Sequence, residues 1–175
     1  MKNWFNNKLS IELEAIYKNK KFPSGGDLII DPLYANKVIC EVSSSACIKM
    51  ELIDCKDCFH CHTVRINADK IFVSPCFRDF QMYLILSKLG KYAAFYWSKK
   101  RGSLFFAPVK TVFEPPDSFF AEIRDKVSES LSFHNFRVIT PEFLSRRVPI
   151  CYSGPIEGED TNPTVLKLLF SEELH

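Results

Sequence analysis

The spacing of apolar residues predicts several amphipathic helices. Apolar positions recur every three or four residues in three segments, which is the period that gives a helix one buried face: 10–18, 78–89 and 117–131. Gly90 offers a stop for the second segment, and Asp117 can serve as the N-cap of the third. A further short helix is expected from Thr140, which precedes a proline, and it should end before Pro149.

Other segments alternate with a period of two and are rich in Val, Ile, Leu and aromatic residues, which predicts strands. They cover 27–31, 38–43, 47–53, 58–66, 71–74, 92–98, 103–109 and 137–139. Turn residues at 54–57 and 99–102 favour hairpins, so an antiparallel meander is the simplest topology. Residues 152–163 are expected to form a polar loop, and 164–174 a last apolar helix or strand. We therefore predict an α+β fold, an antiparallel sheet of hairpins with three to five helices packed on it.

Composition fits one cytoplasmic domain. The chain has 175 residues, of which 46% are hydrophobic and 25% charged, so a domain over 1–175 can bury its own core. The first residues lack the apolar run of a signal peptide, and no apolar stretch is long enough to cross a membrane. A net charge of +2 by itself implies neither a nucleic-acid nor a membrane partner.

The densest cluster of chemically active side chains is rich in cysteine and histidine. Cys55 and Cys58 form a CxxC pair, and Cys61 and Cys76 could complete a tetrahedral zinc site. A structural zinc site usually uses two such pairs, however, and the predicted strand places Cys61 on the face opposite Cys58. We favour a hairpin whose sulfur atoms pack inward, and we assign no metal or cofactor.

Catalysis and nucleic-acid binding have weaker support. None of the common nucleophile, phosphate-binding or metalloprotease motifs occurs, so we do not predict an enzyme. His134 could act as a general base near Glu142 or Asp160, but a polar loop residue is the simpler interpretation. The basic turn 99–101 lies beside aromatic residues that could stack on bases. We interpret it as a solvated hairpin tip above strands whose aromatic residues fill the core.

An acidic segment gives a candidate surface for binding another protein. Glu157, Glu159 and Asp160 place three carboxylates within four residues of the loop near the C-terminus. Such a loop could cover a basic groove in a partner, for example the groove of a nuclease, and speed up their association. The alternative is an ordinary polar surface loop.

The segments 138–144 (VITPEFL) and 164–170 (TVLKLLF) give the chain a resemblance to the cytosolic immunity proteins of bacterial contact-dependent growth inhibition systems. The resemblance covers about the last quarter of the chain and otherwise rests on small size, mixed α and β structure and the absence of catalytic motifs. It implies a tight complex with one toxin, whose predicted activity is that of a nuclease. One feature departs from this pattern, since inhibitors of basic nucleases tend to be acidic and this chain is slightly basic.

Overall fold

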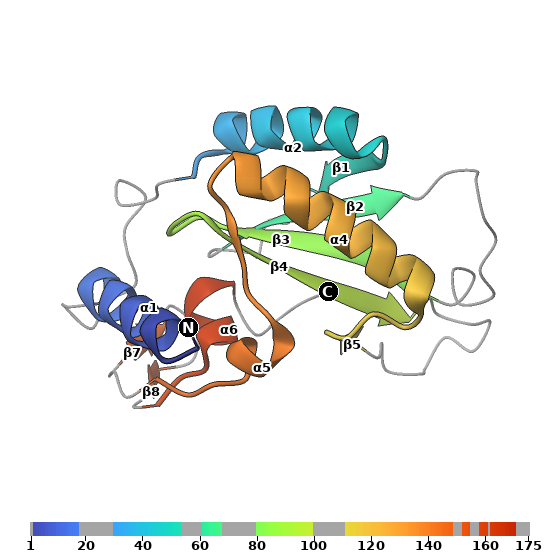
Figure 1. The fold of residues 1–175 in the computed structure, drawn as a ribbon. Coiled ribbons are helices and arrows are strands. Elements are labelled where there is room, and N and C mark those ends of the chain that lie inside the picture. Colours follow the sequence, from blue (N-terminus) through green and yellow to red (C-terminus); the bar gives the residue numbers. More distant parts are fainter. Residues whose placement is uncertain are drawn as a thin grey trace.

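The computed structural model describes residues 2–17, 30–53, 61–67, 80–99, 111–148, 152–154, 158–160 and 162–170. These residues form an α+β fold in which a sheet is covered by helices on both faces (Figure 1). None of the helices in these ranges has both the length and the apolarity needed to cross a membrane.

The sheet is mostly antiparallel, and five of its strands follow chain order. They are β1 (Lys49–Ile53), β2 (Cys61–Asn67), β3 (Phe80–Ser87), β4 (Tyr92–Lys99) and β5 (Thr111–Val112). This order confirms the antiparallel meander as a topology, although its strand β3 lies in a segment predicted to be a helix. A sixth strand, β6 (Arg137–Val138), pairs with β4 in parallel, with Tyr92 opposite Arg137. Because β3 occupies the other edge of β4, β5 and β6 lie along the same edge, β6 at the start of β4 and β5 near its end.

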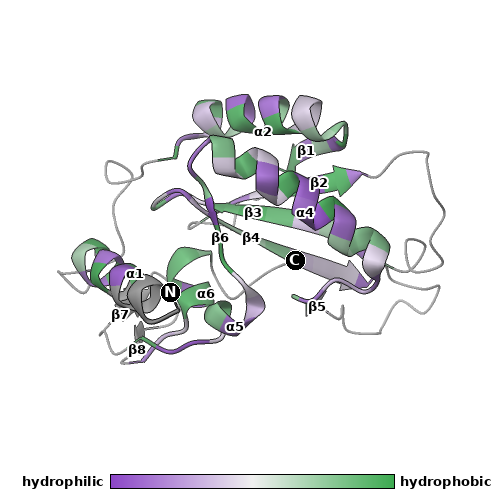
Figure 2. Ribbon diagram, in the orientation of Figure 1, coloured by the Kyte–Doolittle hydropathy of each residue, from purple (hydrophilic) through white to green (hydrophobic). Residues whose placement is uncertain are grey.

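Two long helices form the first layer, α2 (Pro32–Ala46) and α4 (Ser118–Phe133). Asp31 caps α2 by accepting a hydrogen bond from the Tyr34 amide, and Asp117 caps α4 in the same way through Phe120. The α4 prediction, cap included, is confirmed. The buried faces of both helices pack on one face of β2, β3 and β4, around the fully buried Trp97 (Figure 2).

The strands predicted at 38–43 and 27–31 are wrong where the structure describes them. Residues 38–43 lie inside α2, and Asp31 is its N-cap; residues 27–29 lie outside the described ranges. The β-branched residues of this segment favour strands locally, but Asp31 followed by Pro32 starts a helix. Ala35, Val38, Ile39 and Val42 then share one buried helical face.

The helix predicted over 78–89 is also wrong, because residues 80–87 form β3. Met82, Leu84 and Leu86 face the α2/α4 layer, whereas Ile85 faces the opposite layer. A strand covered on both faces is apolar throughout and loses the alternation that identifies a half-buried strand. Its run of apolar residues therefore imitated a helical stripe.

The second layer combines both ends of the chain. It contains α1 (Lys2–Ile16), α5 (Pro141–Leu144) and α6 (Val165–Leu169), which cover the other face of the sheet. The Tyr17 hydroxyl donates to the Leu168 carbonyl, which ties the end of α1 to α6. The short helix predicted after Thr140 is confirmed, while α1 begins earlier than the predicted residue 10.

The remaining predictions fall near the C-terminus or outside the described ranges. The expected polar loop contains a small hairpin, β7 (Tyr152–Gly154) paired with β8 (Gly158–Asp160), and the last apolar segment forms α6. The strands predicted at 71–74 and 103–109, and the turns predicted at 54–57 and 100–102, lie outside the described residues.

Candidate functional site

The acidic segment lies on the small β7–β8 hairpin. In its register Ser153 is opposite Glu159 and Tyr152 is opposite Asp160, while Glu157 lies outside the described residues. Backbone pairing thus holds two of the three predicted partner-binding positions in an ordered ladder. The hairpin lies beside α1 at the periphery of the molecule (Figure 1).

The structure describes one of the four cysteines of the zinc alternative. Cys61 on β2 is 2% exposed, and its thiol donates to the Phe170 carbonyl over 3.0 Å. Cys55, Cys58 and Cys76 lie outside the described residues. Within those residues, no three His, Cys, Asp or Glu side chains are placed to share a metal ion. The Cys61 thiol packs inward between the sheet and the C-terminal segment.

His62 follows Cys61 and faces the α2 layer. Its Nε2 lies 3.0 Å from the Ile30 carbonyl, and because a carbonyl only accepts, Nε2 carries the proton. Burial lowers the pKa of His62 below its ordinary value of 6.5; Lys88 lowers it as well, while the Ile30 hydrogen bond and Asp31 oppose the shift. His62 is therefore a neutral side chain that fixes the entry to α2.

His134, the candidate general base, lies at the C-terminal end of α4. Its Nδ1 is 3.5 Å from a carboxylate oxygen of Glu41 on α2, whereas Glu142 pairs with Arg146. The structure thus places the histidine next to a different carboxylate from the predicted one. This pair links the two helices of the first layer.

The described aromatic residues before the basic turn belong to the core, as our favoured interpretation predicted, while Phe105 and Phe106 after the turn lie outside the described residues. Phe95, Tyr96 and Trp97 are all buried, so none offers a face for stacking on a base. Lys99 is exposed at the end of β4, and 100–101 lie outside the described residues.

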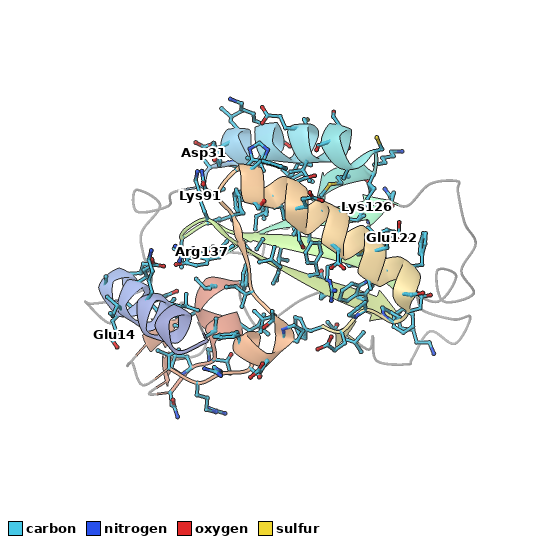
Figure 3. The ribbon with its side chains drawn as sticks, in the orientation of Figure 1. Glu14, Asp31, Lys91, Glu122, Lys126 and Arg137 are labelled. Carbon is cyan, nitrogen blue, oxygen red and sulfur yellow. The ribbon has the colours of Figure 1, made fainter. Side chains whose placement is uncertain are left out.

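A corner of the molecule brings together the start of α2, the end of α4 and the β3–β4 turn. Lys91 in that turn donates to the His134 carbonyl over 3.2 Å, and its ammonium lies 5.6 Å from the centre of the Tyr34 ring. Tyr34 is in the first turn of α2, and His134 directly follows α4. Lys91 thus joins the two helices at their adjacent ends (Figures 1 and 3).

Large apolar side chains are exposed at this same corner. Leu33, next to Tyr34, is 82% exposed, and Phe133, next to His134, is 76% exposed. Cys40 is also exposed, and its position seven residues after Leu33 puts it on the same stripe of α2. We call Leu33, Cys40 and Phe133 the apolar corner.

A cavity of about 290 Å³ opens beside the corner, between α1, the β3–β4 turn and the segment that leads into β6. Its charged lining residues are Glu12, Lys91 and Arg137. The Arg137 amide donates to the Lys91 carbonyl over 2.8 Å, so the parallel pairing of β6 with β4 places these two basic residues together. Figure 3 shows Asp31, Lys91 and Arg137 along this edge of the molecule.

Sequence reasoning identified neither the apolar corner nor the cavity. Leu33 and Phe133 belong to segments whose other apolar residues are buried, and a single sequence does not reveal which apolar residue faces outward. Lys91 and Arg137 meet through a parallel pairing between strands that are far apart in the chain. No linear motif carries that information.

Comparison of the chain with known protein families, with curated proteins and with solved structures finds no match.

Proposed function

We propose that this protein is a protein-binding module that neutralises a cognate toxin, as an immunity protein does. The observation that carries the proposal is the apolar corner, where Leu33 in the first turn of α2 and Phe133 at the end of α4 expose most of their side chains. Covering exposed apolar side chains with a partner lowers the free energy of the complex, and clusters of such side chains mark protein interfaces. Both lie on rigid, capped helices, so their binding costs little ordering entropy.

The charges around the corner define the chemistry of the partner surface. Lys37 is exposed on α2 one turn after Leu33, and Glu41, which pairs with His134, follows one turn later. A partner with an apolar patch and a carboxylate opposite Lys37 would match this order of side chains. The apolar contacts would provide most of the affinity, and the charge would orient the complex.

The acidic hairpin remains a second predicted contact. We expect Glu159 and Asp160 on β8, with Glu157 nearby in the chain, to bind a basic region of the toxin such as the groove of a nuclease. In the view of Figure 1, α1 lies between the hairpin and the start of α2.

The test is affinity capture from the native cells, followed by mass spectrometry of the captured protein. Wild-type protein should capture one stoichiometric partner that survives nuclease treatment. A Leu33→Ser/Phe133→Ser variant should lose it, because serine removes the apolar anchors without touching the core. Ile11→Ser is the matched control, since Ile11 is 64% exposed on α1, away from the corner, and this variant should retain the partner.

Two results would contradict the proposal. One is equal capture by the wild-type protein and the corner variant, which would place the interface elsewhere. The other is a captured partner that causes no toxicity when it is expressed alone. Charge reversal of Glu157, Glu159 and Asp160 to Lys tests the hairpin separately, because it should weaken binding and flatten its dependence on salt.

A further inference from the structure

The cavity beside the corner has a feature that the proposed function does not use. Arg137 lines it with a side chain that is 37% exposed, and its nearest described carboxylate is Glu12, with 3.7 Å between nitrogen and oxygen. That separation is longer than a hydrogen bond. A guanidinium carries five N–H donors, and within the described part of the chain none of them is hydrogen-bonded.

Among the described residues, two cations, Lys91 and Arg137, and one carboxylate, Glu12, line the cavity. Glu12 also lies 4.0 Å from Lys8, so one carboxylate is shared between two cations. Lys91, the other cation in the lining, donates one hydrogen bond to the His134 carbonyl, and no carboxylate of the described residues pairs with it. The Arg137 amide donates to the Lys91 carbonyl, but the two charged groups point apart: the Arg137 guanidinium lies beside Glu12 of α1, and the Lys91 ammonium lies beside Tyr34 of α2. An anion in the cavity would accept the hydrogen bonds that the guanidinium does not make to the described residues.

The remaining walls are fixed in position. Gly90 packs so closely on Tyr92 that a Cβ atom there would lie 2.9 Å from the ring, so the turn and the ring hold each other in place. Asn135, at the mouth, has a positive φ of 61° and ends α4, with the Phe136 amide donating to the Leu131 carbonyl. Asn135 is a polar, uncharged residue of the lining.

We infer that this cavity is a binding site for a small oxyanion, a phosphate or carboxylate group held by the guanidinium of Arg137. A planar guanidinium can donate two parallel hydrogen bonds to either group. A volume of about 290 Å³ is at the lower limit of ligand pockets and suits a small molecule that carries one such group. The inference does not rest on the proposed function, because the apolar corner is a separate surface.

The test is a titration of the intact protein with inorganic phosphate, and separately with acetate, followed by amide NMR at constant ionic strength. The amides of Lys91, Asn135 and Arg137 should shift and saturate. Arg137→Gln should weaken binding at least about tenfold, the loss expected for a charged hydrogen bond. Lys126→Gln is the control, because Lys126 pairs with Glu122 on α4, away from the cavity, and its affinity should not change (Figure 3).

Glu12→Gln gives a result that a purely structural role for these residues does not predict. Removing the competing carboxylate should tighten anion binding about threefold, opposite to the effect of Arg137→Gln. The comparison of Glu12→Gln with wild type remains informative even if the Arg137→Gln variant fails to fold. Thermal melts of each variant reveal such a failure. A lower dissociation constant for phosphate than for acetate would assign a phosphate ligand, and the reverse a carboxylate ligand. Absence of saturable shifts with both anions, or a Glu12→Gln variant that binds no tighter than wild type, would overturn the inference.

Discussion

The two helical layers differ in how they are held to the sheet. The α2/α4 layer consists of two capped helices of 15 and 16 residues, and its inner surface is almost entirely apolar. The opposite layer contains α5 and α6, of only four and five residues, together with α1 from the other end of the chain. Buried hydrogen bonds to the Leu168 and Phe170 carbonyls fasten that layer to Tyr17 and to Cys61 on β2.

This difference follows from helix physics. Helices of four or five residues are not stable by themselves, so α5 and α6 depend on the contacts that hold them. The local sequence, through its capping residues, determines more of the structure of helices α2 and α4. We therefore expect the α2/α4 layer to lose stability mainly when its packing is damaged, and the opposite layer to loosen when a single polar link is removed.

Phe120→Ala should give the largest effect. The Phe120 ring is fully buried in the α2/α4 layer, with its centre 6.3 Å from that of Trp97. Its removal should lower the free energy of unfolding by about 3–5 kcal/mol, measured by urea denaturation. Phe119→Ala, which truncates a half-buried neighbour on the same helix, should cost less than half as much. Equal losses would mean that packing at Phe120 does not dominate this layer.

Tyr17→Phe should act on the other layer. It removes the hydroxyl that donates to the Leu168 carbonyl and should cost about 1–3 kcal/mol, because a buried acceptor loses its partner. Hydrogen exchange should accelerate first in α1, α5 and α6, while amides of α2 and α4 keep their protection. A uniform increase across both layers would contradict the proposed difference between them.

Acid should weaken the entry to α2 through His62. Burial lowers the pKa of His62 in the folded state, so the unfolded chain binds a proton at higher pH than the folded protein does. The contribution of neutral His62 to stability should be fully present above pH 6.5, the ordinary pKa of histidine. It should be lost as the pH drops from there towards the lower pKa of His62 in the folded protein. His62→Gln cannot take up this proton and should flatten the pH dependence of urea midpoints in that window. An unchanged dependence would mean that another group is responsible.

Cys47→Gly should give the smallest effect, and it should stabilise the protein. Cys47 ends α2 with a positive φ of 55°, a conformation that glycine adopts without strain. We expect a gain of up to about 1 kcal/mol in thermal or urea denaturation. Cys40→Gly, at an exposed position inside the same helix, should instead cost about 0.5 kcal/mol. A loss of stability at both positions would contradict the explanation from the positive φ of Cys47.

Local signals in the sequence predicted the parts of the fold that depend on local chemistry. Asp117 followed by a helical stripe identified α4, and Thr140 before a proline identified α5. The errors came from tertiary context. Covering both faces of β3 removed its alternation, and the cap at Asp31 prevailed over the strand preference of the residues that follow it. The cavity between Lys91 and Arg137 depends on a parallel pairing that no local pattern encodes.

The most direct test of toxin neutralisation through the apolar corner is growth rescue. Cells expressing the captured partner would also carry the wild-type protein, the Leu33→Ser/Phe133→Ser variant or the Ile11→Ser control, with equal protein levels verified. The wild-type protein and the control should restore growth, and the corner variant should not, although its urea denaturation curve matches that of the wild type. Full rescue by the corner variant would contradict the account.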